Sequence, residues 1–256
     1  MSNSILKSAG PFMALVALTG CEASDIEING QKGVPFSDIE LAGAPPAKLF
    51  LASGDTVILT EGDTFAIKVE GTGTESLRFV RDSEVIGITR TADWGGDSNA
   101  TIRITMPAPS EVVIGGSGTV KAPTLASNAE INIGGSGLVE FGKVAAEKLG
   151  INIGGSGTVR GAGTAKTLEV VIGGSGDVEL AALKADTAEV TIGGAGDVAF
   201  ASDGTVEANI AGAGDVTVTG TAKCTVNAMG SGTLNCAPAS GGASATIPET
   251  AAKPAE

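Results

Sequence analysis

Short runs of alternating apolar and polar residues lead into and out of a glycine cluster in the second half of the chain. Residues 168–180, for example, read LEVVI-GGSG-DVEL. Alternation with a period of two predicts strands that bury one face, and no helical stripe of comparable length is present in the sequence. The side chains that we expect to point inward are those of Leu168, Val170, Ile172, Val178 and Leu180.

The same unit recurs seven times. The cluster Ile-Gly-Gly-Ser-Gly is first complete at residues 114–118, and successive copies are 18 to 20 residues apart. The copies begin at Ile114, Ile133, Ile153, Ile172, Ile192, Ile210 and Ala228. This period is typical of solenoids, in which each coil buries its apolar side against its neighbours. We therefore predict an all-β fold, a right-handed parallel β-helix of about seven glycine-rich coils of ~19 residues, preceded by an irregular β half.

Aligned copies predict two inward columns of apolar residues, one on each side of the glycine corner. The first column is Val112, Ile131, Ile151, Val170, Val190, Ala208 and Val226, and the second is Val120, Val139, Val159, Val178, Val198, Val216 and Leu234. At the corners, glycine permits φ > 0 and close stacking of backbones. A phosphate-binding loop is the weaker interpretation, because no Gly-Lys-Ser/Thr follows and the next segment has a strand pattern.

Residues 36–110 contain short alternating runs without the glycine cluster or a fixed period. The expected strands are 38–41, 48–51, 56–59, 65–69, 77–80, 85–88 and 101–104. We interpret this stretch as the irregular first half of the same β-structure. It would also cover the N-terminal edge of the solenoid, because open strand edges invite aggregation. Pro107 and Pro109 mark the entry to the regular coils.

The charge balance is acidic, with 16 Lys and Arg against 29 Asp and Glu. Such a surface disfavours nucleic acid as a partner, because little positive charge is available to neutralise phosphates. It also disfavours docking to membranes through basic residues. With 42% apolar residues the composition is not that of a disordered chain, and one elongated domain is expected.

The N-terminus is typical of a bacterial export signal. Residues 9–17 are apolar but too short to span a bilayer, and residues 18–21 read LTGC. This tetrapeptide resembles the lipobox, which implies lipidation of Cys21, and Glu22 after it implies the outer membrane. A plain apolar N-terminus with a chance cysteine is the alternative. The expected segments are a lipoprotein signal peptide at 1–20, the lipidated cysteine and a tether at 21–35, the head at 36–236 (irregular at 36–110, regular at 111–236) and a disordered tail at 237–256.

Two cysteines remain if Cys21 is acylated, and an exported protein is in an oxidising compartment. Cys224 falls on the inward column of Leu149, Leu168 and Val206, and Cys236 on that of Phe141, Leu180, Phe200 and Val218. Both would face the core of the last coil. We predict a disulfide between Cys224 and Cys236 that staples the C-terminal end, and two buried thiols are the alternative.

Two outward columns of carboxylates are the candidates for metal chemistry. They are Asp177, Asp197 and Asp215 after the corner, and Glu169, Glu189 and Glu207 before it. Carboxylates stacked about 5 Å apart repel one another. A divalent cation bound between them would make the electrostatic energy of the column favourable. The GGSGD sequence at 173–177 is also similar to a calcium-binding nonapeptide, although it is one residue short and occurs once per coil instead of twice. Calcium at the aspartate column is therefore a hypothesis beside that of a solvated acidic face, and no other cofactor is expected.

An enzyme is disfavoured. Some β-helices act on polysaccharides, and paired carboxylates of the aspartate column could serve glycoside hydrolysis. However, the chain has no His and no Tyr, its single Trp94 lies outside the repeats, and short side chains predict a surface with no evident cleft. We identify no catalytic residue.

The motifs resemble those of a known family. Residues 36–39 read FSDI where the alternating strands open, Met106-Pro107 precedes the repeats, and Gly150-Ile151-Asn152 follows Ile131-Asn132 of the previous coil. With the Ile-Gly-Gly-Ser-Gly coils they resemble, over about 36–236, the putative auto-transporter adhesin, head GIN-domain family. The resemblance implies a solenoid-like adhesin head on the cell envelope and carries no catalytic residue. A lipid anchor in place of an auto-transporter stalk departs from that pattern.

These expectations combine into one hypothesis and one alternative. The first is a non-enzymatic outer-membrane lipoprotein, held to the membrane by its N-terminal lipid and facing the periplasm or the cell exterior. Its head would bind a surface polysaccharide or a protein. The alternative is a structural scaffold that self-associates laterally or end to end into a homo-oligomer, for example a trimer.

Overall fold

The structure, a computed structural model, describes residues 27–28, 30–91, 94–96 and 99–237. The expected signal peptide, the expected lipidation site Cys21 and the expected tail at 238–256 lie outside the described residues. The only helices in these described ranges are two 3-10 turns of three residues each, and none is long and apolar enough to cross a membrane. The rest of the regular structure is β-strand.

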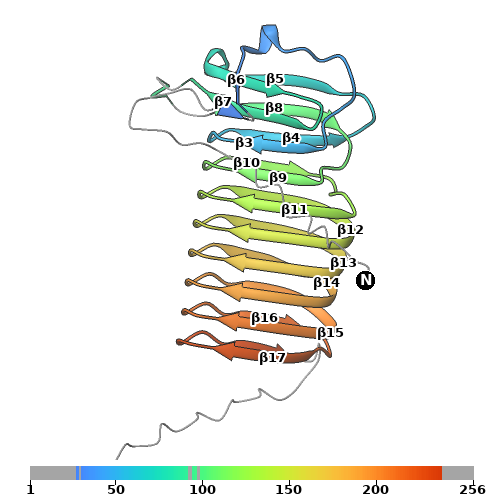
Figure 1. Cartoon of the computed structure of the whole chain (residues 1–256), viewed down its shortest axis with the longest axis vertical. Coiled ribbons are helices and arrows are strands. Elements are labelled where there is room, and N and C mark those ends of the chain that lie inside the picture. The colour runs from blue at the N-terminus through green and yellow to red at the C-terminus, as the bar shows by residue number, and fades with distance from the viewer. Residues whose placement is uncertain (1–26, 29, 92–93, 97–98, 238–256) are drawn as a thin grey trace, which may run out of the picture.

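The glycine-rich repeats form a rod of stacked coils, as predicted (Figure 1). Their strands are β9 (Glu111–Ile114), β10 (Thr119–Ala122), β11 (Asn128–Ile133), β12 (Leu138–Ile153), β13 (Thr158–Ile172), β14 (Asp177–Ile192), β15 (Val198–Ile210), β16 (Val216–Thr219), β17 (Lys223–Ala228) and β18 (Leu234–Ala237). In the middle coils one long strand covers everything between two successive glycine corners. It bends around the edge of the rod opposite those corners, and its pairing register shifts there.

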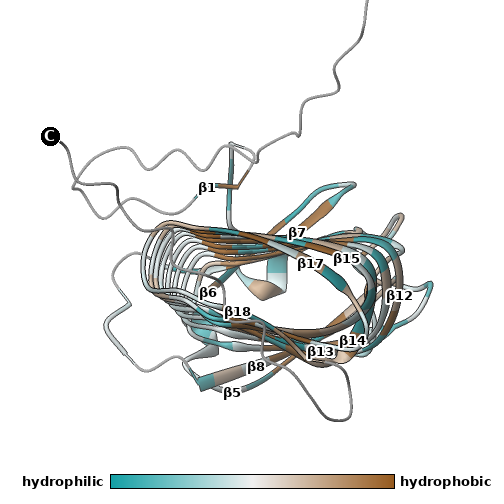
Figure 2. Cartoon of the chain, turned by 90° about the horizontal axis from the view of Figure 1, so that it is seen from below, coloured by the Kyte–Doolittle hydropathy of each residue, from teal (hydrophilic) through white to brown (hydrophobic). Residues whose placement is uncertain are grey.

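Each coil therefore has two walls. We call the strands that lead into a glycine corner the pre-corner wall and those that follow it the post-corner wall. Neighbouring coils pair in parallel in both walls. Seen along the rod, the coils superimpose (Figure 2). The space between the walls is filled by the buried apolar side chains of the coils. All described coils share one continuous apolar core.

Both predicted apolar columns are confirmed by register and burial. Ile131 pairs with Val112 and Ile151, and Val139 pairs with Val120 and Val159. Every member of the two columns is buried except Val226 and Leu234 in the last coil, which are partly buried. The end of a stack has no further coil to cover it, so its apolar side chains are less shielded.

The corner glycines are needed for close backbone stacking and not, in general, for φ > 0. Among the glycines of the seven clusters only Gly230 has positive φ. A Cβ on Gly174 would instead overlap the carbonyl oxygen of Gly155 in the previous corner. The ladder also continues through the corners, where the Ser136 N–H donates to the Gly116 oxygen at 3.1 Å. The expectation of φ > 0 is therefore wrong for the cluster glycines other than Gly230, and that of close stacking is confirmed.

The N-terminal half adds coils of the same kind in a different order. Its elements are β1 (Glu27–Ile28), β2 (Gln31–Lys32), η1 (Phe36–Asp38), β3 (Lys48–Leu51), β4 (Thr56–Glu61), β5 (Ala66–Thr72), η2 (Thr74–Ser76), β6 (Leu77–Arg81), β7 (Val85–Arg90) and β8 (Asn99–Met106). The β3–β4 coil lies between the β7–β8 coil and the β9–β10 coil, so spatial order departs from chain order. The segment from Met106 to Ser110, which contains both prolines, connects β8 to β9.

Antiparallel strands close this end of the rod. β5 pairs with β8 and β6 pairs with β7, both antiparallel, so the N-terminal edge is covered as expected. Six of the seven expected strands are present. The prediction of a strand at 38–41 was wrong, because Phe36–Asp38 form a 3-10 turn. The centroid of the Phe36 ring lies 5.5 Å from that of Phe79. The β1–β2 hairpin also lies within the segment interpreted as a tether, with Ile28 packed on Phe50 and Val80.

A buried ion pair holds the first corner. Asp55 is fully buried and the Arg90 side chain is 6% exposed. Arg90 donates through Nε to Asp55 Oδ2 at 2.8 Å and through Nη2 to Oδ1 at 2.6 Å. The carboxylate also accepts hydrogen bonds from the Ser53 hydroxyl and the Ala100 N–H. Strand β4 pairs with β10, and Asp55 comes directly before β4 as Gly118 comes directly before β10. The ion pair therefore lies next to the first glycine corner of the stack.

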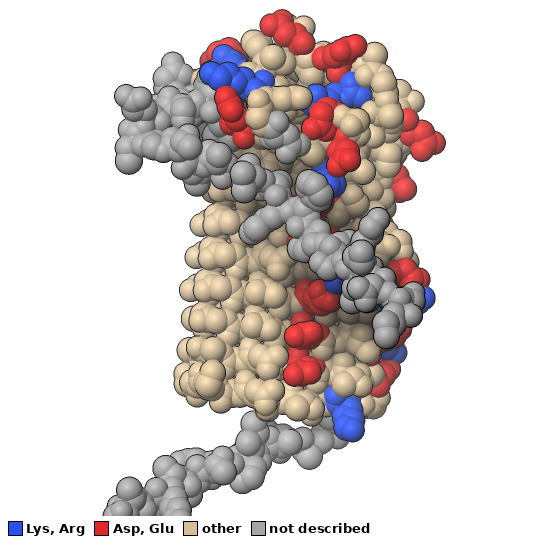
Figure 3. Space-filling view, in the orientation of Figure 1, with Lys and Arg blue, Asp and Glu red and all other residues tan. Residues whose placement is uncertain are grey.

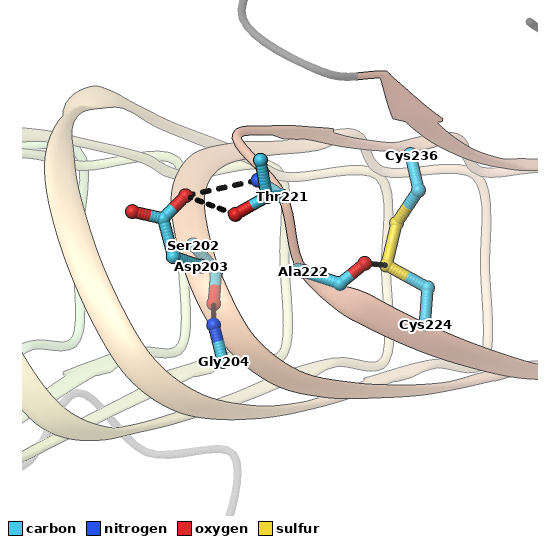
Figure 4. The surroundings of a disulfide bond; sticks show 7 residues. All are labelled: Ser202, Asp203, Gly204, Thr221, Ala222, Cys224 and Cys236. Atoms are coloured by element: carbon cyan, nitrogen blue, oxygen red, sulfur yellow. Dashed lines mark hydrogen bonds between the residues drawn. A yellow bond between two sulfur atoms is a disulfide. The ribbon is translucent and has the colours of Figure 1, made fainter.

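A disulfide closes the other end. Cys224 on β17 and Cys236 on β18 are bonded across the last coil, with 6.6 Å between their Cα atoms (Figure 4). Their registers are those predicted, since Cys224 pairs with Val206 and Cys236 with Val218. The bond therefore joins the two walls over the end of the core.

Candidate binding surface

The aspartate column has a structural role that the sequence did not indicate. The Asp215 N–H donates to Asp197 Oδ1 at 2.9 Å, and the Asp197 N–H donates to Asp177 Oδ1 at 3.3 Å. Thr233 continues the series by donating its N–H and its hydroxyl to Asp215. Each carboxylate thus accepts a hydrogen bond from the backbone of the next coil, which explains acidic residues stacked in one line.

Calcium binding at Asp177, Asp197 and Asp215 stays a prediction. In the part of the chain that the structure describes, no group of three or more His, Cys, Asp or Glu side chains is arranged to hold a metal ion. The hydrogen bonds to the next coil account for the column without a cation.

The second acidic column runs along the pre-corner wall and is longer than expected. By register it consists of Glu111, Glu130, Gly150, Glu169, Glu189 and Glu207. Gly150 is the single interruption in this series. A Cβ there would lie 3.6 Å from Glu130 Cγ and 3.9 Å from the Ala129 oxygen, which are ordinary van der Waals distances. The stacking of coils therefore does not require glycine at position 150.

A hollow of about 430 Å³ lies over Gly150. It is lined by Ser110, Asn128, Ala129, Glu130, Lys148, Gly150, Asn152, Glu169 and Val171. Val171 is an exposed apolar residue, at 46%. The expectation of a surface without a cleft was wrong at this point.

Two pairs of side chains fix the rim of this hollow. Lys148 Nζ lies 2.8 Å from Glu169 Oε1, and Asn152 Nδ2 donates to Glu130 Oε1 at 3.1 Å. The same Asn152 amide donates to Asn132 Oδ1 at 2.9 Å. The hollow therefore has defined acceptors and a cation, set on the walls of a rigid β-structure.

A second hollow, of about 380 Å³, lies at the N-terminal end between residues 31–44 and the end of β6. Arg81 lines it, and its guanidinium donates to the carbonyl oxygens of Glu40, Ala42 and Ala44 at 2.6 to 3.0 Å. The same guanidinium lies 4.5 Å from the Phe65 ring centroid. These contacts hold the 40–44 segment in place, so the polar side of this hollow is used by the fold.

Ion pairs between coils set the charge of the remaining outer surface. Arg160 donates to Glu179 at 2.8 and 2.9 Å, which lowers the pKa of that carboxyl and raises the pKa of the guanidinium. Lys184 and the N–H and hydroxyl of Thr221 lower the pKa of Asp203 to about 2 (Figure 4). Between such pairs a broad strip along the rod, beside the column of acidic side chains, carries no charge (Figure 3).

Comparisons with known proteins agree with this architecture. The family described as putative auto-transporter adhesin, head GIN domain, matches residues 45–222. A search of curated proteins found no match. Among solved structures, a putative adhesin from Bacteroides fragilis NCTC 9343 is similar with a TM-score of 0.66 and 19% identity, covering 76% of this chain and 92% of that one.

Two further solved structures share the fold at low identity. A putative lipid binding protein from Parabacteroides distasonis ATCC 8503 has a TM-score of 0.58 and 20% identity, with 77% of this chain and 94% of that chain covered. A putative adhesin from Parabacteroides merdae ATCC 43184 has a TM-score of 0.52 and 16% identity, with 76% and 92% covered. The stacked coils and the match over residues 45–222 give one conclusion: the chain belongs to the putative auto-transporter adhesin, head GIN-domain family.

Proposed function

We propose that this protein is a lipid-anchored lipoprotein of the outer membrane whose β-solenoid head is a non-enzymatic binding surface. The observation that carries the proposal is a rod with one continuous core, closed at one end by antiparallel strands and at the other by a disulfide. We expect binding along the flanks of the rod. Self-association, laterally or end to end, is the alternative, because among the described strands β17 and β18 have a paired neighbour on one side only.

Two further features support export and a binding role. A disulfide between Cys224 and Cys236 suits an oxidising compartment such as the cell envelope. The family and two of its structural neighbours carry the adhesin name. The lipobox-like LTGC at 18–21 supports lipidation of Cys21, and acyl chains on that residue would supply the anchor.

The proposal is tested by labelling and protease accessibility on intact cells. An alkyne analogue of palmitate should label the wild-type protein and not Cys21→Ala. Protease added to intact cells should digest a surface-exposed head, with cells of permeabilised outer membrane as the control. Protection until permeabilisation would place the head in the periplasm and direct the search to envelope partners. Absence of label on the wild type would overturn the lipid anchor.

A further inference from the structure

We propose that the hollow over Gly150 is a binding site for uncharged sugar residues of a glycan. This inference rests on the proposed function of the head as a binding surface and names its site and its class of ligand. Four features support it. They are a glycine that the backbone does not require, the polar groups around it, the net charge of these groups, and the exposed Val171 beside them.

Gly150 is the residue that makes the hollow. Five of the six aligned positions from Glu111 to Glu207 carry glutamate, and Gly150 is buried beneath its neighbours. Nothing in the backbone requires glycine here, since its φ is not in the positive region and a Cβ would fit. Glycine inside a strand also weakens it. The absent side chain therefore has no evident use for stability, and its effect is the open space above it.

The groups around this space suit a polyhydroxylated ligand. Glu130, Glu169 and the Asn152 carbonyl are acceptors for sugar hydroxyls, and the Lys148 ammonium and the Asn128 amide are donors. Because each sugar hydroxyl both donates and accepts, a mixed set of this kind can bind several of them. Val171, exposed beside the hollow, can pack against the C–H face of a sugar ring.

The charge of the hollow selects against acidic glycans. Its lining contains two carboxylates and one ammonium, and Lys148 is already paired with Glu169. Glu111, next to Glu130 in the same column, adds a further carboxylate nearby. A uronate, sulfate or phosphate placed here would meet unneutralised negative charge, which disfavours binding.

Filling the hollow with the column's own residue gives a sharp test. Gly150→Glu would restore an unbroken glutamate column, and Gly150→Gln would fill the same space without charge. Glu189→Gly is the matched control, because it opens a gap in the same column away from Lys148 and Asn152. Thermal unfolding of all three variants shows whether each remains folded.

The probes are hexamers of glucose and of N-acetylglucosamine, and oligogalacturonate serves as the acidic probe. Binding to the full-length protein, purified in detergent, is measured by calorimetry and by saturation-transfer NMR. We expect at least one neutral hexamer to bind the wild type. Both Gly150 variants should weaken that binding about tenfold or more, Glu189→Gly should leave it unchanged, and oligogalacturonate should bind more weakly than the neutral sugar.

The outcomes separate this inference from the proposed function. Neutral sugar binding that persists in both folded Gly150 variants would overturn the site. Preference for oligogalacturonate, or no binding of either neutral hexamer, would overturn the ligand class. Neither result affects the lipid label on Cys21 or the protease accessibility of the head, which test the proposed function by themselves.

Discussion

The two ends of this rod are closed by different means. At the N-terminal end the chain leaves the parallel pattern, adds the antiparallel strands β5 and β6, and contains the buried Asp55–Arg90 pair. At the C-terminal end the parallel coils continue to β17 and β18, and the Cys224–Cys236 bond joins the two walls. One end is closed by extra structure, whereas the other is closed by one covalent bond.

This difference shows how a solenoid can be closed without a cap domain. Stability in stacked repeats is approximately a sum of terms between neighbours, so each end needs only a local solution. An ion pair stabilises the buried end only if both partners remain, because a lone buried charge is costly. A disulfide acts mainly by restricting the unfolded chain and can stabilise an end that has little to pack against. The two ends should therefore respond differently to substitution.

The largest effect is expected from breaking the ion pair. Arg90→Met leaves the Asp55 carboxylate, which is fully buried, without its counter-ion. We expect a loss of roughly 3–5 kcal/mol in the free energy of unfolding. Urea unfolding followed by Trp94 fluorescence measures it, since the Arg90 guanidinium lies 4.9 Å from the centroid of that ring.

The matched double variant Asp55→Asn with Arg90→Met separates charge from packing. The neutral amide keeps an acceptor for the Ala100 N–H but removes the buried charge. We expect this variant to recover much of the lost stability. A loss under about 1 kcal/mol in the single variant would show that the pair does not hold this end.

A smaller loss in the free energy of unfolding is expected from substituting a corner glycine in the coils between the two ends. Gly174→Ala places a Cβ against the Gly155 carbonyl oxygen of the previous corner, whereas the nearest atom to a Cβ on the adjacent Gly173 is 4.0 Å away. We expect Gly174→Ala to cost about 3 kcal/mol, because stacked backbones cannot move apart without losing hydrogen bonds. Gly173→Ala should change stability by less than about 0.5 kcal/mol.

Thermal and urea unfolding of these two variants provide the comparison within one corner. Equal effects would show that corner glycines are needed for conformation and not for close stacking. Both variants keep the two ends intact, so they also measure how much the stack contributes independently of its closures.

The regular half of the fold could be predicted because its information is local and periodic. A period of two placed the inward side chains, and a period near 19 aligned Cys224 and Cys236 with columns that face the same core. The order of the N-terminal coils could not be predicted in this way. The position of β3–β4 between β7–β8 and β9–β10 depends on pairing between distant segments, which leaves no periodic signal.

The hollow over Gly150 was missed although the sequence contains its signal. The aligned repeats place Glu169, Glu189 and Glu207 in one column. Extending that column backwards shows glycine between two glutamates. The backbone requires glycine at position 174 but not at position 150. This difference follows from distances between coils, which the sequence does not contain.

The smallest of the three effects is expected at the C-terminal end. The double substitution Cys224→Ala and Cys236→Ala removes a bond that spans 12 positions along the chain, which corresponds to a loss of about 2–3 kcal/mol in the free energy of unfolding.

Because coils interact mainly with their neighbours, this loss of stability should be local. Hydrogen exchange should show faster opening of β17 and β18, with β9 to β13 protected as in the wild type. In Arg90→Met the pattern should be reversed, with β7 and β8 opening first. Uniform loss of protection along the rod in both variants would mean that the ends are not closed independently and that the solenoid unfolds as one cooperative unit.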